Sequence, residues 1–127
     1  MKVTLTNGTE LNPIMVTGES RYIQGASRDT LTFVFAGVSL DEMDSIFTAE
    51  NCETISIIND EEEAIYNGYT LRAELVKKQV EVQKATTETD AVTEERVFVS
   101  MAQRTYAENQ MAIMQAAMNA LLTGKEV

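Results

Sequence analysis

The chain has 127 residues, of which 44% are hydrophobic, and its 20 acidic and 10 basic side chains give a formal net charge of −10. This length and composition predict one folded domain with a hydrophobic core and exclude global disorder. The acidic excess argues against a nucleic-acid partner, because binding a phosphate backbone requires a clustered positive surface. No apolar run approaches the ~20 residues of a membrane span, and the N-terminus lacks a signal-peptide apolar region, so we expect synthesis in the cytoplasm and no membrane partner.

The N-terminal part predicts a β-hairpin. Residues 2–6 alternate between apolar and polar and lead into an Asn-Gly pair, which is typical of a hairpin turn because both residues tolerate positive φ. The returning strand is predicted over residues 9–18, at an edge or with a bulge, because Pro13 cannot donate a ladder hydrogen bond. Residues 19–29 contain Gly, Ser and Asp and predict a loop.

A strand and a short helix follow. Residues 30–36 place three large apolar side chains on one face, which predicts a strand. A Ser-x-x-Glu capping box at residues 39–42 predicts a helix over residues 39–51. The apolar stripe of that helix consists of Leu40, Met43, Ile46 and Phe47.

The remaining strands are predicted from alternation. Residues 53–60 predict a strand with Ile55 and Ile57 facing inward, and residues 61–68 predict a turn and a short strand. Residues 69–75 alternate as well, but the valines at 80 and 82 fall on the opposite parity, so we expect a bulge or turn around residues 76–78.

The polar, Thr-rich segment 84–95 predicts an exposed, mobile loop. Residues 96–102 resume a strand on which Val97, Val99 and Met101 share one face. The chain therefore predicts an α+β fold, mainly antiparallel β-sheet, with one short internal helix and a longer C-terminal helix. Its organisation is a β-rich domain over residues 1–104, followed by a helix over residues 105–124.

The C-terminal helix is the most unusual segment of the sequence. It opens with a second capping box at residues 105–108 and contains no charged side chain between Glu108 and Lys125. Apolar residues with the 4, 3, 4, 3 spacing of a coiled-coil seam are Ala107, Met111, Met114, Met118 and Leu121. Two interpretations are open: the helix packs on its own domain as core, or Met111, Met114, Met118 and Leu121 contact other molecules.

Catalytic and metal-binding chemistry is poorly represented. The chain has no His, which removes the usual general base and the commonest metal ligand, and no Gly-rich phosphate loop. Cys52 is the only cysteine and lacks the basic neighbours of a reactive thiol. We therefore expect no enzyme activity, no catalytic or metal site, no cofactor and no small-molecule substrate.

The predicted loop around residue 25 is a second, weaker interaction candidate. Arg21, Arg28 and Asp29 flank a Gly there and could pair across an interface. The alternative is a local turn with a surface ion pair, which is worth under ~1 kcal/mol.

Four segments together resemble small proteins encoded in prophage tail modules of Gram-positive bacteria. They read TLTNGTELNPI, QGASRDTLTFVF, AENCETISI and VSMAQRTYAENQ, and the resemblance extends over nearly the whole chain. It implies a structural or assembly role in the virion, in a tail or baseplate, with copies of the chain or other phage tail proteins as partners. The alternative is a cytoplasmic adaptor or regulatory binding module of prophage origin.

Overall fold

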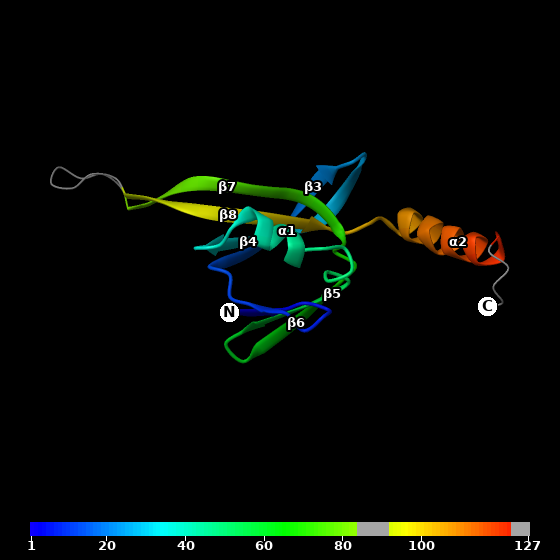
Figure 1. Ribbon diagram of the computed structural model, residues 1–127, viewed down its shortest axis with the longest axis horizontal. Helices are drawn as coiled ribbons and strands as arrows, with labels where there is room; N and C mark the ends of the chain where they lie inside the picture. The colour runs from blue at the N-terminus through cyan, green and yellow to red at the C-terminus, as the bar shows by residue number, and fades with distance from the viewer. Residues whose placement is uncertain (84–91, 123–127) are drawn as a thin grey trace.

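The computed structural model describes residues 1–83 and 92–122, which form two antiparallel β-sheets and two α-helices (Figure 1). One sheet has the strand order β2-β1-β5-β6 and the other β3-β4-β8-β7. The strands are β1 Lys2–Thr4, β2 Glu10–Leu11, β3 Met15–Ile23, β4 Ala26–Ala36, β5 Thr54–Asn59, β6 Glu62–Asn67, β7 Leu71–Gln83 and β8 Val92–Ala102, and the helices are α1 Leu40–Ile46 and α2 Tyr106–Leu122. This arrangement confirms the predicted α+β class.

The hydrophobic core lies where the two sheets and α1 come together. Alternation on the strands supplies it, because successive side chains of a strand point to opposite faces. Residues that were predicted to face inward and are buried are Leu31, Phe33, Phe35, Ile55, Ile57, Val97, Val99 and Met101. Val3 and Leu5 join them from the N-terminal hairpin.

Helix α1 covers one side of the core. Met43 and Phe47 are buried, and the ring of Phe47 lies 5.2 Å from that of Phe33 and 5.8 Å from that of Phe35, centroid to centroid. Leu40, by contrast, is exposed. The Ser39 hydroxyl accepts a hydrogen bond from the Glu42 amide at 3.1 Å, as the capping box predicted.

The end of α1 corrects the predicted helix of residues 39–51, because α1 stops at Ile46. Side chains from outside the helix satisfy its terminal carbonyls. Arg72 donates to the carbonyl of Phe47 at 2.6 Å, and Asn51 donates through its side chain to that of Ile46 at 2.9 Å.

The N-terminal hairpin forms, but its predicted return strand over residues 9–18 is wrong. Val3 pairs with Leu11, so the Asn-Gly turn joins β1 to β2 as expected. The chain then leaves the ladder at Pro13 and continues as β3 in the other sheet. A proline cannot donate to the ladder, and here the segment around it connects two sheets instead of forming a bulge within one.

The loop predicted over residues 19–29 is also wrong. β3 and β4 form one continuous hairpin, and only Gln24 and Gly25 lie between the Ile23–Ala26 pair. Both turn residues have positive φ, 48° and 84°, which is the geometry of a two-residue type I′ turn. Asn-Gly is the usual pair for such a turn, so Gln-Gly gave a weak signal in the sequence.

The β7–β8 hairpin is longer than predicted. β7 runs unbroken through residues 76–78, and its register shifts lie between Arg72 and Glu74 and between Glu81 and Gln83. Within the predicted loop of residues 84–95, residues 84–91 lie outside the described part of the chain. Residues 92–95 belong to β8, and their side chains are exposed. The polar residues at 93–95 are therefore those of an exposed strand end.

Candidate functional site: the projecting C-terminal helix

The start of α2 is held by a reciprocal capping box. The Glu108 amide donates to the Thr105 hydroxyl at 3.2 Å, and the Thr105 amide donates to Oε1 of Glu108 at 2.8 Å. Two amide groups that would lack partners at the helix start are thereby satisfied. The sequence pattern predicted this cap correctly.

Arg28 ties this first turn to the body of the protein. Its side chain is 1% exposed and forms a two-pronged ion pair with the Glu108 carboxylate, with the Nη2–Oε2 distance at 2.9 Å. The same guanidinium donates to the carbonyls of Ile23 at 2.7 Å and Gln103 at 3.2 Å. These hydrogen bonds connect the β3–β4 turn, the segment after β8 and α2, so they fix where the helix leaves the sheet.

The ion pair also changes the acidity of Glu108. The hydrogen bond from Arg28 and then the bond from the Thr105 amide lower the pKa of Glu108 from 4.5 to about 2. Glu108 is therefore ionised at neutral pH, and its charge is matched by that of Arg28. The remaining described length of α2 carries no charged residue.

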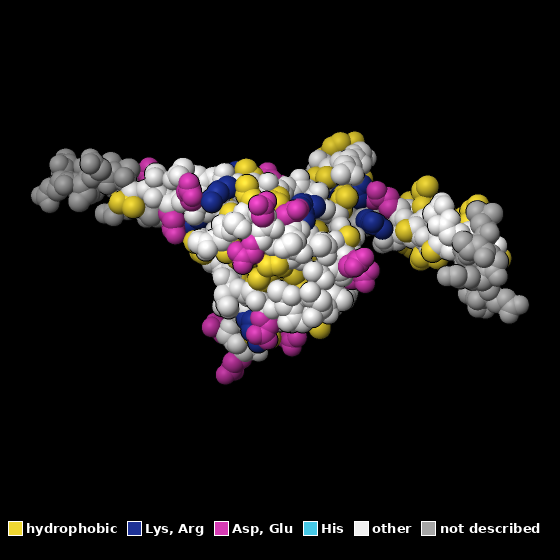
Figure 2. All heavy atoms as spheres, viewed as in Figure 1, with side chains coloured by type: hydrophobic (Ala, Val, Ile, Leu, Met, Phe, Trp, Pro, Cys, Tyr) yellow, Lys and Arg dark blue, Asp and Glu magenta, His cyan; other side chains and the backbone are white. Residues whose placement is uncertain are grey.

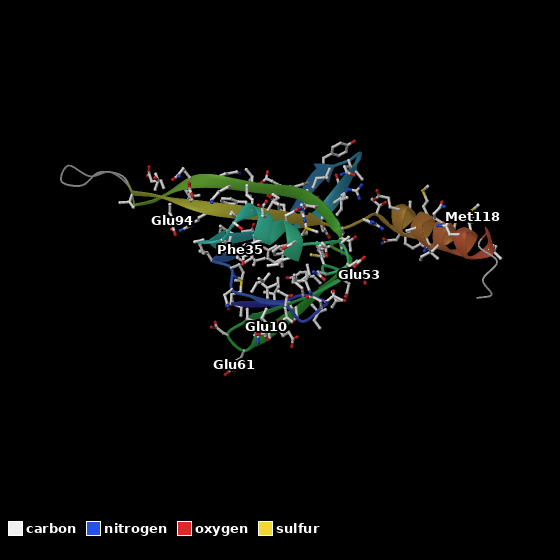
Figure 3. All side chains as sticks on the ribbon, in the orientation of Figure 1. Glu10, Phe35, Glu53, Glu61, Glu94 and Met118 are labelled. Atoms are coloured by element: carbon white, nitrogen blue, oxygen red, sulfur yellow. The ribbon has the colours of Figure 1, made fainter. Side chains whose placement is uncertain are left out.

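Beyond this first turn, α2 extends away from the two sheets (Figure 1). The side chains of its predicted seam face solvent: Met111 is 70% exposed, Met114 63%, Met118 55% and Leu121 74%. Figure 2 shows hydrophobic side chains along the projecting helix, and Figure 3 shows Met118 on it, far from Phe35 in the core. The interpretation that this helix packs on its own domain as core is therefore wrong for the single chain.

The weaker candidate residues Arg21, Arg28 and Asp29 lie on strands, contrary to the predicted loop. Arg21 and Arg28 are opposite each other across the β3–β4 hairpin. Arg21 donates to Glu19 at 2.5 Å and to the hydroxyl of Thr32 at 3.4 Å, whereas the Asp29 carbonyl accepts from the Gln103 amide at 2.9 Å. Arg28 is buried in a pair within the chain, which corrects the expectation that it could pair across an interface.

A cleft of about 510 Å³, lined by residues of both sheets, was not predicted. Its apolar lining includes Leu31, Ile57 and Tyr69, and its acidic lining residues are Glu19, Asp29, Glu62 and Glu63. These residues come from β3, β4, β5, β6 and the segment before β7, so only the long-range pairing of strands assembles them. No local sequence pattern could have indicated this cleft.

Cys52 lies in the core and has no exposed surface. Burial raises the pKa of its thiol to about 12, although Arg72 nearby acts in the opposite direction. A thiol that stays protonated at neutral pH is a poor nucleophile and a poor metal ligand. Within residues 1–83 and 92–122, no group of three or more Cys, Asp or Glu side chains is placed to hold a metal ion.

In the described part of the chain, neither helix is long and apolar enough to cross a membrane. Comparison of the chain with protein-family models, curated proteins and solved structures finds no match. The candidate site is therefore defined by its own geometry: an apolar, nearly uncharged helix that is fixed at its base and whose described side chains beyond the first turn are exposed.

Proposed function

We propose that this chain is a structural or assembly protein of a phage or prophage particle, a tail or baseplate component that acts through protein–protein contacts and has no enzyme activity. One observation carries the proposal: α2 exposes Met111, Met114, Met118 and Leu121 to solvent. Contiguous apolar surface of this kind is typical of a protein–protein contact and unusual on a monomer. Methionine suits such a surface, because its flexible, polarisable side chain adapts to a partner.

The anchoring of α2 supports the same function. Arg28 holds the first turn of α2 with hydrogen bonds to two segments of the body and to Glu108. A fixed base reduces the conformational entropy lost when the helix docks. The resemblance to proteins of prophage tail modules supplies the biological setting, with synthesis in the bacterial cytoplasm and incorporation into the virion.

The mass of the purified chain in solution tests the contact directly. We expect an oligomer by light scattering at high protein concentration, and we expect Met114→Asp to dissociate it because a carboxylate cannot be buried unpaired in an apolar contact. Ala112→Asp is the matched control, since it adds the same charge to the exposed opposite side of α2. Both variants should keep the thermal unfolding of the body, because neither residue is buried.

The biological part of the proposal is tested on particles. Mass spectrometry of virions purified from a strain carrying the gene should find the chain at a constant ratio to other tail proteins. Particles should not assemble with the Met114→Asp variant. A chain found only in the cytoplasm, with normal particles formed without it, would instead favour an adaptor or regulatory binding module.

A further inference from the structure

Beside the seam already described, helix α2 carries a second row in which three of four side chains are apolar and the fourth is Gln110. The residues Tyr106, Gln110, Ile113 and Ala117 repeat the 4, 3, 4 spacing of the first row, shifted by one position. Tyr106 is 79% exposed and Ile113 63% exposed. One residue advances an α-helix by about 100°, so the two rows lie about 100° apart around α2 and face different neighbours.

The charge distribution allows copies of α2 to lie side by side. From Asn109 to Leu122 the helix has no charged side chain, and the acid at its base, Glu108, is paired with Arg28. Identical helices can therefore approach one another without like-charge repulsion along their length, whereas the whole chain carries a formal net charge of −10. The described part of α2 is thus suited to contact between copies.

The size of α2 limits the area that two helices can bury along one row. A helix of 17 residues is about 26 Å long, and a strip about 10 Å wide gives roughly 250 Å² per helix, or about 500 Å² for a pair. Stable specific interfaces bury about 1,200 Å² or more. A pair of helices joined along one row falls below this area. In a closed ring each chain buries about 500 Å² against two neighbours, so the area buried by the whole ring reaches about 1,500 Å² with three chains, while each single contact stays at about 500 Å².

We propose that α2 assembles with copies of itself into a closed parallel bundle of three or more helices, in which each helix uses its first row on one neighbour and its second row on the other. This inference rests on the proposed function and names its partner, which is another copy of the chain. The contact joins two different surfaces, and such a head-to-tail contact closes into a ring when the rotation between neighbours divides a full turn evenly. Their separation of about 100° lies between the interior angles of a square and a pentagon, so the geometry is nearest to a ring of four or five helices.

The side chains of the two rows are chemically complementary. In such a ring all copies of α2 lie at the same level, so Ile113 of one helix lies beside Met111 and Met114 of the next, and Tyr106 lies beside Ala107. The flexible methionine side chains fill irregular gaps beside the β-branched Ile113. The two-sheet bodies of all chains then lie at one end of the bundle. The Arg28 contacts at the base of each helix set the angle between that body and the bundle.

The experiment compares three full-length variants with the wild-type chain by native mass spectrometry and light scattering over a range of concentrations. Met114→Gln changes the first row, Ile113→Gln changes the second row, and Ala112→Gln is the control on the remaining side of the helix. We expect a wild-type mass of three or more chains. Each row variant should raise the concentration needed for assembly at least roughly tenfold, because each removes buried apolar surface from every contact. The control should leave this concentration unchanged.

Other results would overturn the inference. A wild-type dimer that Met114→Gln dissociates and Ile113→Gln leaves intact would show pairing along one row only, and the proposed function would stand. A wild-type chain that stays monomeric at all concentrations would exclude self-assembly through α2. The analysis of purified particles described above would then decide separately whether the chain is a virion protein with a different partner. Circular dichroism of each variant checks that the helix and the sheets remain folded.

Discussion

Arg28 and Glu108 lie 80 residues apart in the sequence and form a two-pronged ion pair that joins the start of β4 to the first turn of α2. Arg28 is buried, whereas the Glu108 side chain is 40% exposed. The guanidinium also satisfies backbone carbonyls on both sides of this junction. This ion pair therefore fixes the first turn of α2 to the body of the protein.

The first prediction concerns pH. The pKa of Glu108 is lowered from 4.5 to about 2, so its stabilising contribution is complete above about pH 4.5 and is lost as the pH falls toward 2. An NMR titration of the Glu108 carboxyl should give a midpoint near 2, and Arg28→Ala should return the midpoint toward 4.5. A wild-type midpoint near 4.5 would show that the ion pair does not persist in solution.

The second prediction concerns the buried guanidinium. Arg28→Ala should lower the melting temperature of the body, because it leaves the carbonyls of Ile23 and Gln103 without this donor and removes the partner of Glu108. Arg21→Ala is the matched control on the opposite strand, where the side chain is 34% exposed. Thermal unfolding followed by circular dichroism should show the larger loss for Arg28, and equal losses would contradict the anchoring role.

The third prediction concerns the core. Phe47→Ala should reduce the free energy of unfolding by about 3–5 kcal/mol, because it opens a cavity between α1 and the rings of Phe33 and Phe35. Urea denaturation measures this change. Tyr22→Ala, at a side chain that is 77% exposed, should change the free energy by about 0.5 kcal/mol or less. A small effect of Phe47→Ala would mean that α1 does not cover the core.

The fourth prediction concerns the cysteine. The pKa of Cys52 is raised to about 12 and the side chain is fully buried, so a thiol-specific disulfide reagent should not label the native chain at pH 8. Urea should make the thiol reactive at the same concentration that unfolds the sheets. Rapid labelling of the native protein would indicate that the segment between α1 and β5 opens.

The same pKa shift gives a dependence at alkaline pH. A raised pKa means that the protonated thiol favours the folded state, so this contribution is present below about pH 9 and is lost as the pH rises toward 12. Stability measured in urea should fall over this range. Cys52→Ala should remove the part of the fall that the thiol causes.

Local sequence patterns predicted an element of this fold correctly where residues of one helix turn or one strand face determine it. The buried faces of β4, β5 and β8 followed from alternation, and both capping boxes formed. The errors came where the outcome depended on residues far away. α1 ends at Ile46, next to the Phe47 carbonyl to which Arg72 donates from a distant strand, and the turn at Gln24 and Gly25 was recognisable only from the pairing of β3 with β4.

The candidate site likewise has some features that local sequence predicts and others that depend on distant residues. The sequence by itself determined that α2 is a capped helix with an apolar seam and no charges beyond its first turn, because periodicity and capping depend on residues a few positions apart. Only the tertiary structure decided that the sheets complete a core without α2, that Arg28 holds its base, and that a cleft lies between β3 and β6. Those outcomes depend on which distant strands pair and how much apolar surface they bury together, and no short window of sequence contains that information.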